Sequence, residues 1–129
     1  MKQQKITFYN KRKKFSLKVF KVSWISESVG LMFSGRENAK VLLFNYSKSA
    51  SLGIHSVFVF FPFIAVWLDK NNSVIDITFV KPFSLHVNIK KNWSRLIEIP
   101  INKKNKYLVK FLLDKPEFNK AYSTGIRKV

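Results

Sequence analysis

The stretch from Phe63 to Val80 reads Phe-Ile-Ala-Val-Trp-Leu-Asp, then Lys-Asn-Asn-Ser, then Val-Ile-Asp-Ile-Thr-Phe-Val. Two runs rich in β-branched and aromatic residues, separated by a short polar turn, are typical of an antiparallel hairpin. The first run is almost entirely apolar, which indicates a strand that is buried on both faces. We therefore expect strands over Phe63–Asp69 and Val74–Val80, joined by the turn Lys70–Ser73.

Further short strands are expected on both sides of this hairpin. Phe15–Val19 alternates apolar and polar residues, as a strand with one buried face does, and Ile6–Tyr9 is a candidate first strand. The remaining expected strands are Val41–Tyr46, Ile54–Phe61, Arg95–Ile99 and Tyr107–Leu113, and the alternation over Ser84–Asn92 leaves that segment unassigned. From Lys115 onward the chain is expected to form an extended tail.

One short helix is expected over residues 24–33. Ser23 or Ser26 can cap its N-terminus, and Ile25, Val29 and Met32 occur at helical spacing. Many short strands with a single helix favour a mostly β fold, and a closed or nearly closed barrel would hide the sheet edges. The length of 129 residues suits one domain. We therefore expect a compact β-barrel-like single domain over residues 1–129.

Three motifs in the central part of the chain carry a resemblance to a known family. They are Gly-Leu-Met-Phe at residues 30–33, Ile-His-Ser-Val-Phe-Val-Phe-Phe-Pro at residues 54–62 and Leu-Ile-Glu-Ile-Pro at residues 96–100. Their order and spacing, within residues 18–100, resemble domain of unknown function family 192 in its shorter, archaeal cytoplasmic form. The resemblance implies a compact β-barrel-like domain with a short helix near Gly-Leu-Met. It implies no particular activity, because none is settled for the family.

The chain departs from the family pattern at three places. Val29 stands where the family usually has arginine, and Ile64 stands where it usually has an acidic residue. The sequence Ile-Asn-Lys-Lys-Asn-Lys at residues 101–106 replaces the usual glycine and Gly-Asp pair. An activity that depends on those polar groups is therefore in doubt. The basic segments 1–17 and 101–129, which flank the family-like core, favour a binding module.

Positive charge is concentrated at the two ends of the chain. The 24 Lys and Arg residues outnumber the 7 Asp and Glu residues, which gives a formal net charge of +17. Residues 1–21 hold eight basic residues and no acid, and residues 101–129 hold eight basic residues against Asp114 and Glu117. Such a surface favours a polyanionic partner. A strong AT bias in a genome is the alternative source of so many lysines, but it does not explain why acids are scarce at both ends.

No secretory or membrane-spanning segment is recognised. The apolar residues Ile6–Tyr9 are fewer than the ~7–15 residues of a signal-peptide core. The longest apolar stretch, Val57–Leu68, is shorter than the ~20 residues of a spanning helix, and it contains Pro62. Cysteine is absent, which excludes disulfides and thiolate metal sites. We therefore expect a soluble, cytoplasmic protein.

Residues suited to catalysis are few. His55 and His86 are the two histidines, and no pair of ligands has the spacing typical of a zinc site, so neither a metal nor a cofactor is expected. The four glycines are isolated, so a phosphate-binding loop is not expected either. A non-catalytic role is favoured. The alternative is a small-molecule-binding or enzymatic barrel with His55 and Asp69 near its pocket.

Residues suited to nucleic-acid binding are more abundant. Lys and Arg neutralise phosphates and release counterions, and aromatic rings stack on unpaired bases. The candidate residues are Lys11, Arg12, Lys13, Lys14, Lys90, Lys91, Trp93, Arg95, Lys103, Lys104 and Lys106. For Trp93, burial beneath the end of the barrel is the favoured alternative. A folded core with two basic ends is also how many components of ribonucleoprotein particles are built.

The sequence thus predicts a non-catalytic RNA- or ribonucleoprotein-binding protein, and ribosome association is the specific form to test. An anionic membrane surface is a weaker candidate partner, because the basic ends do not read as an amphipathic helix. The sequence leaves the oligomeric state, the identity of the RNA and any sequence preference open.

Overall fold

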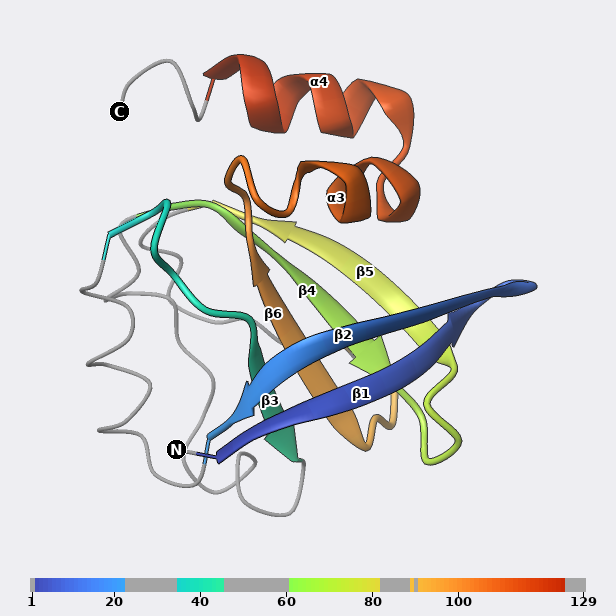
Figure 1. Cartoon of the computed structure of the whole chain (residues 1–129). Helices are drawn as coiled ribbons and strands as arrows, with labels where there is room; N and C mark the ends of the chain where they lie inside the picture. Colours follow the sequence, from blue (N-terminus) through green and yellow to red (C-terminus); the bar gives the residue numbers. More distant parts are fainter. Residues whose placement is uncertain (1, 23–34, 46–60, 82–88, 90, 125–129) are drawn as a thin grey trace.

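The computed structural model describes residues 2–22, 35–45, 61–81, 89 and 91–124. In chain order the elements are β1 (Lys2–Asn10), β2 (Lys13–Lys21), β3 (Leu42–Asn45), β4 (Phe63–Leu68), β5 (Val74–Val80), β6 (Arg95–Pro100), α3 (Lys106–Leu112) and α4 (Lys115–Thr124). The strands form one curled sheet, a half-barrel, in the order β1-β2-β3-β6-β4-β5 (Figure 1). Neighbouring strands are antiparallel except β2 and β3, which are parallel. The mostly β, barrel-like architecture expected from the sequence is therefore confirmed.

The strands β1 and β2 form a long ribbon that crosses in front of β4 and β6 in the view of Figure 1. Asn10 pairs with Lys13, which leaves Lys11 and Arg12 as a two-residue turn. Lys11 has a φ of 58°, and the first position of tight hairpin turns commonly requires a positive φ. The ribbon therefore ends in a sharp tip that holds consecutive basic residues.

The ribbon partly closes the half-barrel by contacting the turn between β4 and β5. The backbone N–H of Tyr9 donates to the carbonyl oxygen of Asn72 at 2.9 Å. The side-chain amide of Asn72 donates in return to the carbonyl oxygen of Thr7 at 3.0 Å. Asn72 has a φ of 62°, a left-handed conformation that asparagine tolerates better than most residues. These bonds hold β1 against the far side of the sheet.

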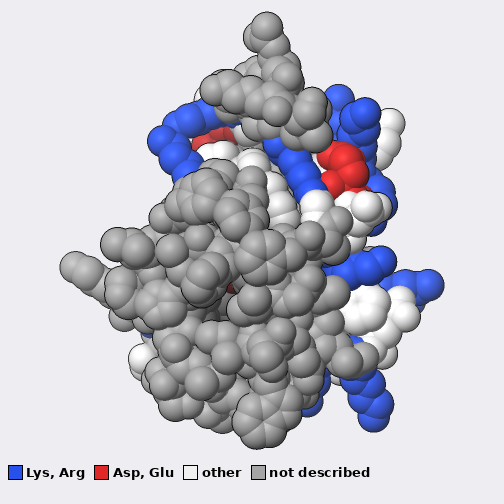
Figure 2. All heavy atoms as spheres, turned by 90° about the vertical axis from the view of Figure 1, so that its left-hand side faces the viewer, with Lys and Arg blue, Asp and Glu red and all other residues white. Residues whose placement is uncertain are grey.

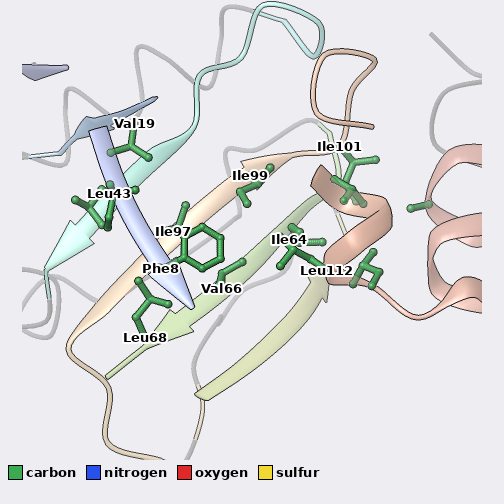
Figure 3. Packing of buried hydrophobic residues seen from close by; sticks show 14 residues of the cluster. Phe8, Val19, Leu43, Ile64, Val66, Leu68, Ile97, Ile99, Ile101 and Leu112 are labelled. Atoms are coloured by element: carbon green, nitrogen blue, oxygen red, sulfur yellow. The ribbon is translucent and has the colours of Figure 1, made fainter. Parts of the chain in front are cut away.

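The strand β4 is buried along its whole length and separates two apolar clusters. Ile64, Val66 and Leu68 point to one face, where residues of β1 and α3 pack against them (Figure 3). Phe63, Ala65 and Trp67 alternate with them and point to the other face. This two-sided burial explains the almost unbroken apolar run of the sequence.

The strand predicted over Tyr107–Leu113 is wrong, because Lys106–Leu112 forms helix α3. A short apolar run does not by itself distinguish a strand from a buried helix. Here Val109, Leu112 and Leu113 are buried at the i, i+3 and i+4 spacing of a helix face. In Figure 3 Leu112 lies close to Ile64 and Ile101. The helix therefore covers one end of the main core.

The extended tail predicted from Lys115 onward is also wrong, because Lys115–Thr124 forms helix α4. Pro116 lies in the first turn, where a missing backbone N–H breaks no helical hydrogen bond. Phe118, Ala121 and Tyr122 recur at helical spacing and join the main core. Helices α3 and α4 lie one above the other across one end of the sheet (Figure 1). Much of the basic C-terminal extension is thus folded.

Several other predictions are confirmed, and some lie outside the described residues. The predicted hairpin matches β4 and β5 to within one residue, and Arg95–Ile99 matches β6 to within one residue. The first strand is longer than predicted, because the polar residues of Lys2–Lys5 extend it along the sheet edge. The predicted helix over residues 24–33 and nearly all of the predicted strand Ile54–Phe61 lie outside the described residues.

Candidate nucleic-acid interface

The end of the β1–β2 ribbon carries the strongest local concentration of positive charge predicted from the sequence. Lys11, Arg12, Lys13 and Lys14 are all exposed there, and we call these four residues the basic tip. Their closeness follows from the tight turn, which places two cations in the loop and two at the start of β2. The tip can therefore present several cations to one polyanion.

One face of α3 adds aromatic rings to the lysines of the C-terminal segment. Tyr107 is 77% exposed and Phe111 is 55% exposed, and both belong to this face with the exposed residues Lys106 and Lys110. We call these four residues the α3 outer face. Tyr107, Lys110 and Phe111 are not among the predicted site residues, because the sequence pattern predicts a strand over Tyr107–Leu113. The spacing of Val109, Leu112 and Leu113 is that of a buried helix face, and a helix predicted from it would place Tyr107, Lys110 and Phe111 on the exposed side.

The basic tip and the α3 outer face meet. The Lys13 ammonium lies 5.3 Å from the centroid of the Phe111 ring, a distance typical of a cation–π contact. A cavity of about 400 Å³ opens beside this contact. It is lined by Asn10, Lys11, Arg12, Lys13, Phe111, Leu112, Leu113 and Asp114. The fold therefore brings the two basic ends of the chain into one surface, although their like charges repel each other.

Local electrostatics around this junction are mixed. The C-terminal end of a helix carries a partial negative charge, so cations of the basic tip are favoured beside the end of α3. Asp114 is the acidic residue among those lining the cavity. From the side opposite the basic tip, Figure 2 shows further Lys and Arg side chains at the helical end of the molecule, with some acidic side chains beside them. The negative end of α3 and the Asp114 carboxylate therefore offset part of the repulsion among the cations of the basic tip.

The predicted residues of the loop before α3 lie at the other end of that helix. Lys103 and Lys104 are exposed between β6 and α3, and Lys106 begins α3. The Lys106 ammonium lies 5.8 Å from the ring centroid of Tyr122 in α4. The helix rises about 10 Å over its seven residues, so these lysines and the basic tip flank its two ends.

The predicted group around Trp93 does not form a basic aromatic surface. Trp93 is 7% exposed and meets the Trp67 ring edge-on at a centroid distance of 5.1 Å, so it belongs to the core. Arg95 is half-buried and donates a 2.6 Å hydrogen bond to the side-chain oxygen of Asn72. Lys91 is exposed, and Lys90 lies outside the described residues.

The alternative pocket around His55 and Asp69 receives no support from the described residues. His55 lies outside them, and so does His86. The Asp69 carboxylate accepts hydrogen bonds from the backbone N–H groups of Asn71 and Ser73, at 2.8 and 3.0 Å. Asp69 therefore shapes the β4–β5 turn. Within the described ranges, no three His, Cys, Asp or Glu side chains converge as a metal site would require.

A buried acid lies on β6, away from the basic tip. Glu98 is 5% exposed, and it stands opposite Leu42 of β3 and Ala65 of β4. Burial raises the pKa of the Glu98 carboxyl to about 8, because an apolar environment disfavours the charged form. Its neighbours across the strands are apolar, so the carboxyl is held mainly in its neutral form near neutral pH.

Comparisons with models of known protein families, with functionally curated proteins and with solved structures give no match. The resemblance to domain of unknown function family 192 therefore stays a prediction. Among the described residues, no helix is long and apolar enough to cross a membrane. What can be inferred about function therefore comes from the interface itself.

Proposed function

We propose that this protein is a non-catalytic RNA-binding module that associates with RNA, or with a ribonucleoprotein particle, through the basic tip and the α3 outer face. The observation that carries the proposal is the meeting of the tip with an exposed aromatic ring, Lys13 against Phe111. Cations supply affinity for phosphates, and exposed rings supply stacking surfaces for unpaired bases. Single-stranded or looped RNA fits this mixture better than duplex DNA, whose bases are already stacked.

The exposed side of the ribbon supports the same proposal. Lys5 lies directly opposite Lys18, and Tyr9 lies directly opposite Lys14, all of them exposed. Like charges directly opposite each other on a ribbon destabilise it. A polyanion that neutralises these charges would relieve that repulsion. The ribbon would then extend the binding surface away from the tip.

The proposal is tested by the salt dependence of RNA binding to the full chain. The test variant carries Lys11→Glu and Lys14→Glu, and the probe is a labelled single-stranded RNA of mixed sequence. The logarithm of the association constant should fall linearly with the logarithm of salt concentration. Loss of two phosphate contacts should weaken binding and reduce the magnitude of that slope by about 1.4, because each contact to a single strand contributes about 0.7.

A matched control separates the tip from the total charge. Lys2→Glu with Lys40→Glu changes the net charge by the same amount. Lys2 begins β1, about 25 Å from the tip along the strand, and the Lys40 ammonium lies 5.8 Å from the Phe20 ring near the same far end of the ribbon. The control should keep most of the slope. Equal losses in both variants would show that charge acts without a defined surface, and binding to anionic vesicles but not to RNA would overturn the proposal.

A further inference from the structure

The cavity between the basic tip and the end of α3 has the chemistry of a nucleotide site. Its volume of about 400 Å³ lies within the range of about 300–1,000 Å³ that is usual for small-ligand pockets. One wall is cationic, from Lys11, Arg12 and Lys13, and Phe111 contributes an aromatic ring. A nucleotide joins an anionic phosphate to a flat aromatic base, so these two kinds of wall match its two parts.

We infer that this cavity holds one unpaired nucleotide of the bound RNA, with its base on Phe111 and its phosphate toward the basic tip. The inference rests on the proposed function and adds to it a single defined site for one base. Phe111 is 55% exposed, so a base can reach its ring. The Lys13 ammonium lies at that ring, and the long, flexible lysine stem allows it to turn from the ring to a phosphate.

Asp114 fixes the direction in which a nucleotide can lie. The phosphate is repelled by the Asp114 carboxylate and attracted by the basic tip, so the base must lie on the Asp114 side. A carboxylate only accepts hydrogen bonds, and it pairs best with two adjacent N–H donors. Guanine is the base whose pairing edge offers two such donors side by side. The site should therefore prefer guanine.

The walls of the cavity are built on folded elements. Leu112 and Leu113 are 7% exposed and belong to the main core, which fixes the end of α3. The Leu113 N–H donates to the Val109 carbonyl at 2.9 Å and continues the helical bonding to the end of the helix. The tip is held by the paired residues Asn10 and Lys13. The site is therefore largely formed before the RNA arrives, which lowers the entropy cost of binding.

The experiment compares two blunt-ended RNA duplexes that differ by one bulged guanine, so that the bulge is the designed unpaired nucleotide, and each is titrated with the full chain. The bulged RNA should bind about tenfold more tightly, within the range that one base–aromatic stack provides. Phe111→Leu should abolish this difference, whereas Phe111→Tyr should retain it. Tyr107→Leu is the matched control, because Tyr107 is also an exposed aromatic residue of α3 but does not line the cavity. Because Tyr107 belongs to the α3 outer face, this variant should weaken binding of both RNAs alike and leave the tenfold difference in place.

The outcomes separate this inference from the proposed function. Equal, salt-sensitive binding of both RNAs would overturn the nucleotide site and leave RNA binding intact. No binding to either RNA would overturn both. Replacing the bulged guanine by uracil should reduce affinity for the normal chain, and Asp114→Asn should remove that difference between bases. A bulge preference that is equal for all four bases would refute the role given to Asp114.

Discussion

Arg95 donates a 2.6 Å hydrogen bond to the side-chain oxygen of Asn72, and this bond ties β6 to the turn that closes the half-barrel. The same asparagine donates to the carbonyl oxygen of Thr7 and accepts from the N–H of Tyr9 through its own carbonyl. One side chain therefore links three parts of the sheet: β1, the β4–β5 turn and β6. Arg95 thus has a structural partner, although the sequence placed it among the RNA-binding residues.

Removing this link should destabilise the protein without weakening RNA binding by the folded form. Asn72→Gly keeps the positive φ but leaves Arg95 and the Thr7 carbonyl without this partner. We expect the free energy of unfolding to fall by about 1–3 kcal/mol, the cost of leaving part-buried polar groups unsatisfied. Urea denaturation measures it. A double-mutant cycle with Arg95→Ala should show coupling, and additive effects of the two changes would contradict the link.

Asn102 should be a second structural anchor, because it joins three segments. Its side chain is fully buried, donates to the Arg36 carbonyl at 3.0 Å and accepts from the Asn105 N–H at 3.0 Å. Its carbonyl accepts from the Tyr122 hydroxyl of α4 at 2.9 Å. Asn102→Ala leaves the buried Arg36 carbonyl and the part-buried Asn105 N–H without this partner, so we expect a loss of about 1–3 kcal/mol in the free energy of unfolding.

The Asn102 prediction has an internal control. Tyr122→Phe removes one hydrogen bond at a half-buried position and leaves the amide contacts of Asn102 in place. Its cost should be smaller, about 0.5–1.5 kcal/mol. Hydrogen exchange should show α4 opening more easily in Tyr122→Phe than in Asn102→Ala, because Asn102→Ala keeps the backbone carbonyl that accepts from the Tyr122 hydroxyl. Protection of α4 in Tyr122→Phe that equals that of the unchanged chain would refute this account.

Glu98 should make stability depend on pH. Burial raises its pKa in the folded state from 4.5 to about 8, so the folded protein holds this proton more tightly than the unfolded chain does. The stabilisation is complete below about pH 4.5 and is lost as the pH rises through about 8. Across that interval Glu98 should lower the free energy of unfolding by at most about 1.4 kcal/mol per pH unit.

Glu98→Gln is the test of that dependence, because glutamine keeps the size of the side chain and cannot ionise. Urea denaturation at about pH 5 and about pH 9 should show a smaller fall in stability for this variant than for the unchanged chain. Above about pH 8 the variant should be the more stable of the two, since it avoids a buried charge. The same fall in both proteins would assign the pH dependence to other groups.

The sequence predicted the strands well where burial leaves a local pattern. Val74–Val80 has the bounds predicted for it, and β4 carries the continuous apolar run of a strand buried on both sides. The run Tyr107–Leu113 is also largely apolar, and an apolar run of that length does not by itself distinguish a strand from a helix. Its helical state follows from Val109 and Leu112, which pack on one face against the core.

The sequence predicted the basic tip of the candidate site but not its contact with α3, because a contact between distant segments leaves no local pattern. Composition and position are local, so the charges of the basic tip could be found from the sequence. The Lys13–Phe111 contact joins residues at opposite ends of the chain, and it depends on how α3 docks across the sheet. Trp93 shows the converse, because a ring flanked by lysines is buried against Trp67 once the chain folds.

Substitutions at Lys18, which lies opposite Lys5, should change the free energy of unfolding and the affinity for RNA in opposite directions. The two residues are directly opposite on the ribbon, beside the Thr7–Ser16 side-chain hydrogen bond of 2.9 Å. Lys18→Glu converts a repulsive pair into an attractive one, so it should raise the free energy of unfolding by about a few tenths of a kcal/mol. Lys18→Gln removes the repulsion alone and should fall between the two. The differences should shrink at high salt, because both residues are exposed.

Affinity for RNA should follow the opposite order: the unchanged chain binds most tightly, then Lys18→Gln, then Lys18→Glu. Both series are measured on the same preparations, by urea denaturation and by titration with labelled single-stranded RNA. The opposed orders are expected because the Lys5–Lys18 repulsion is retained in the free protein and relieved by phosphates in the complex. If Lys18→Glu stabilises the ribbon and leaves RNA affinity unchanged, the RNA surface ends at the basic tip and does not extend along the ribbon.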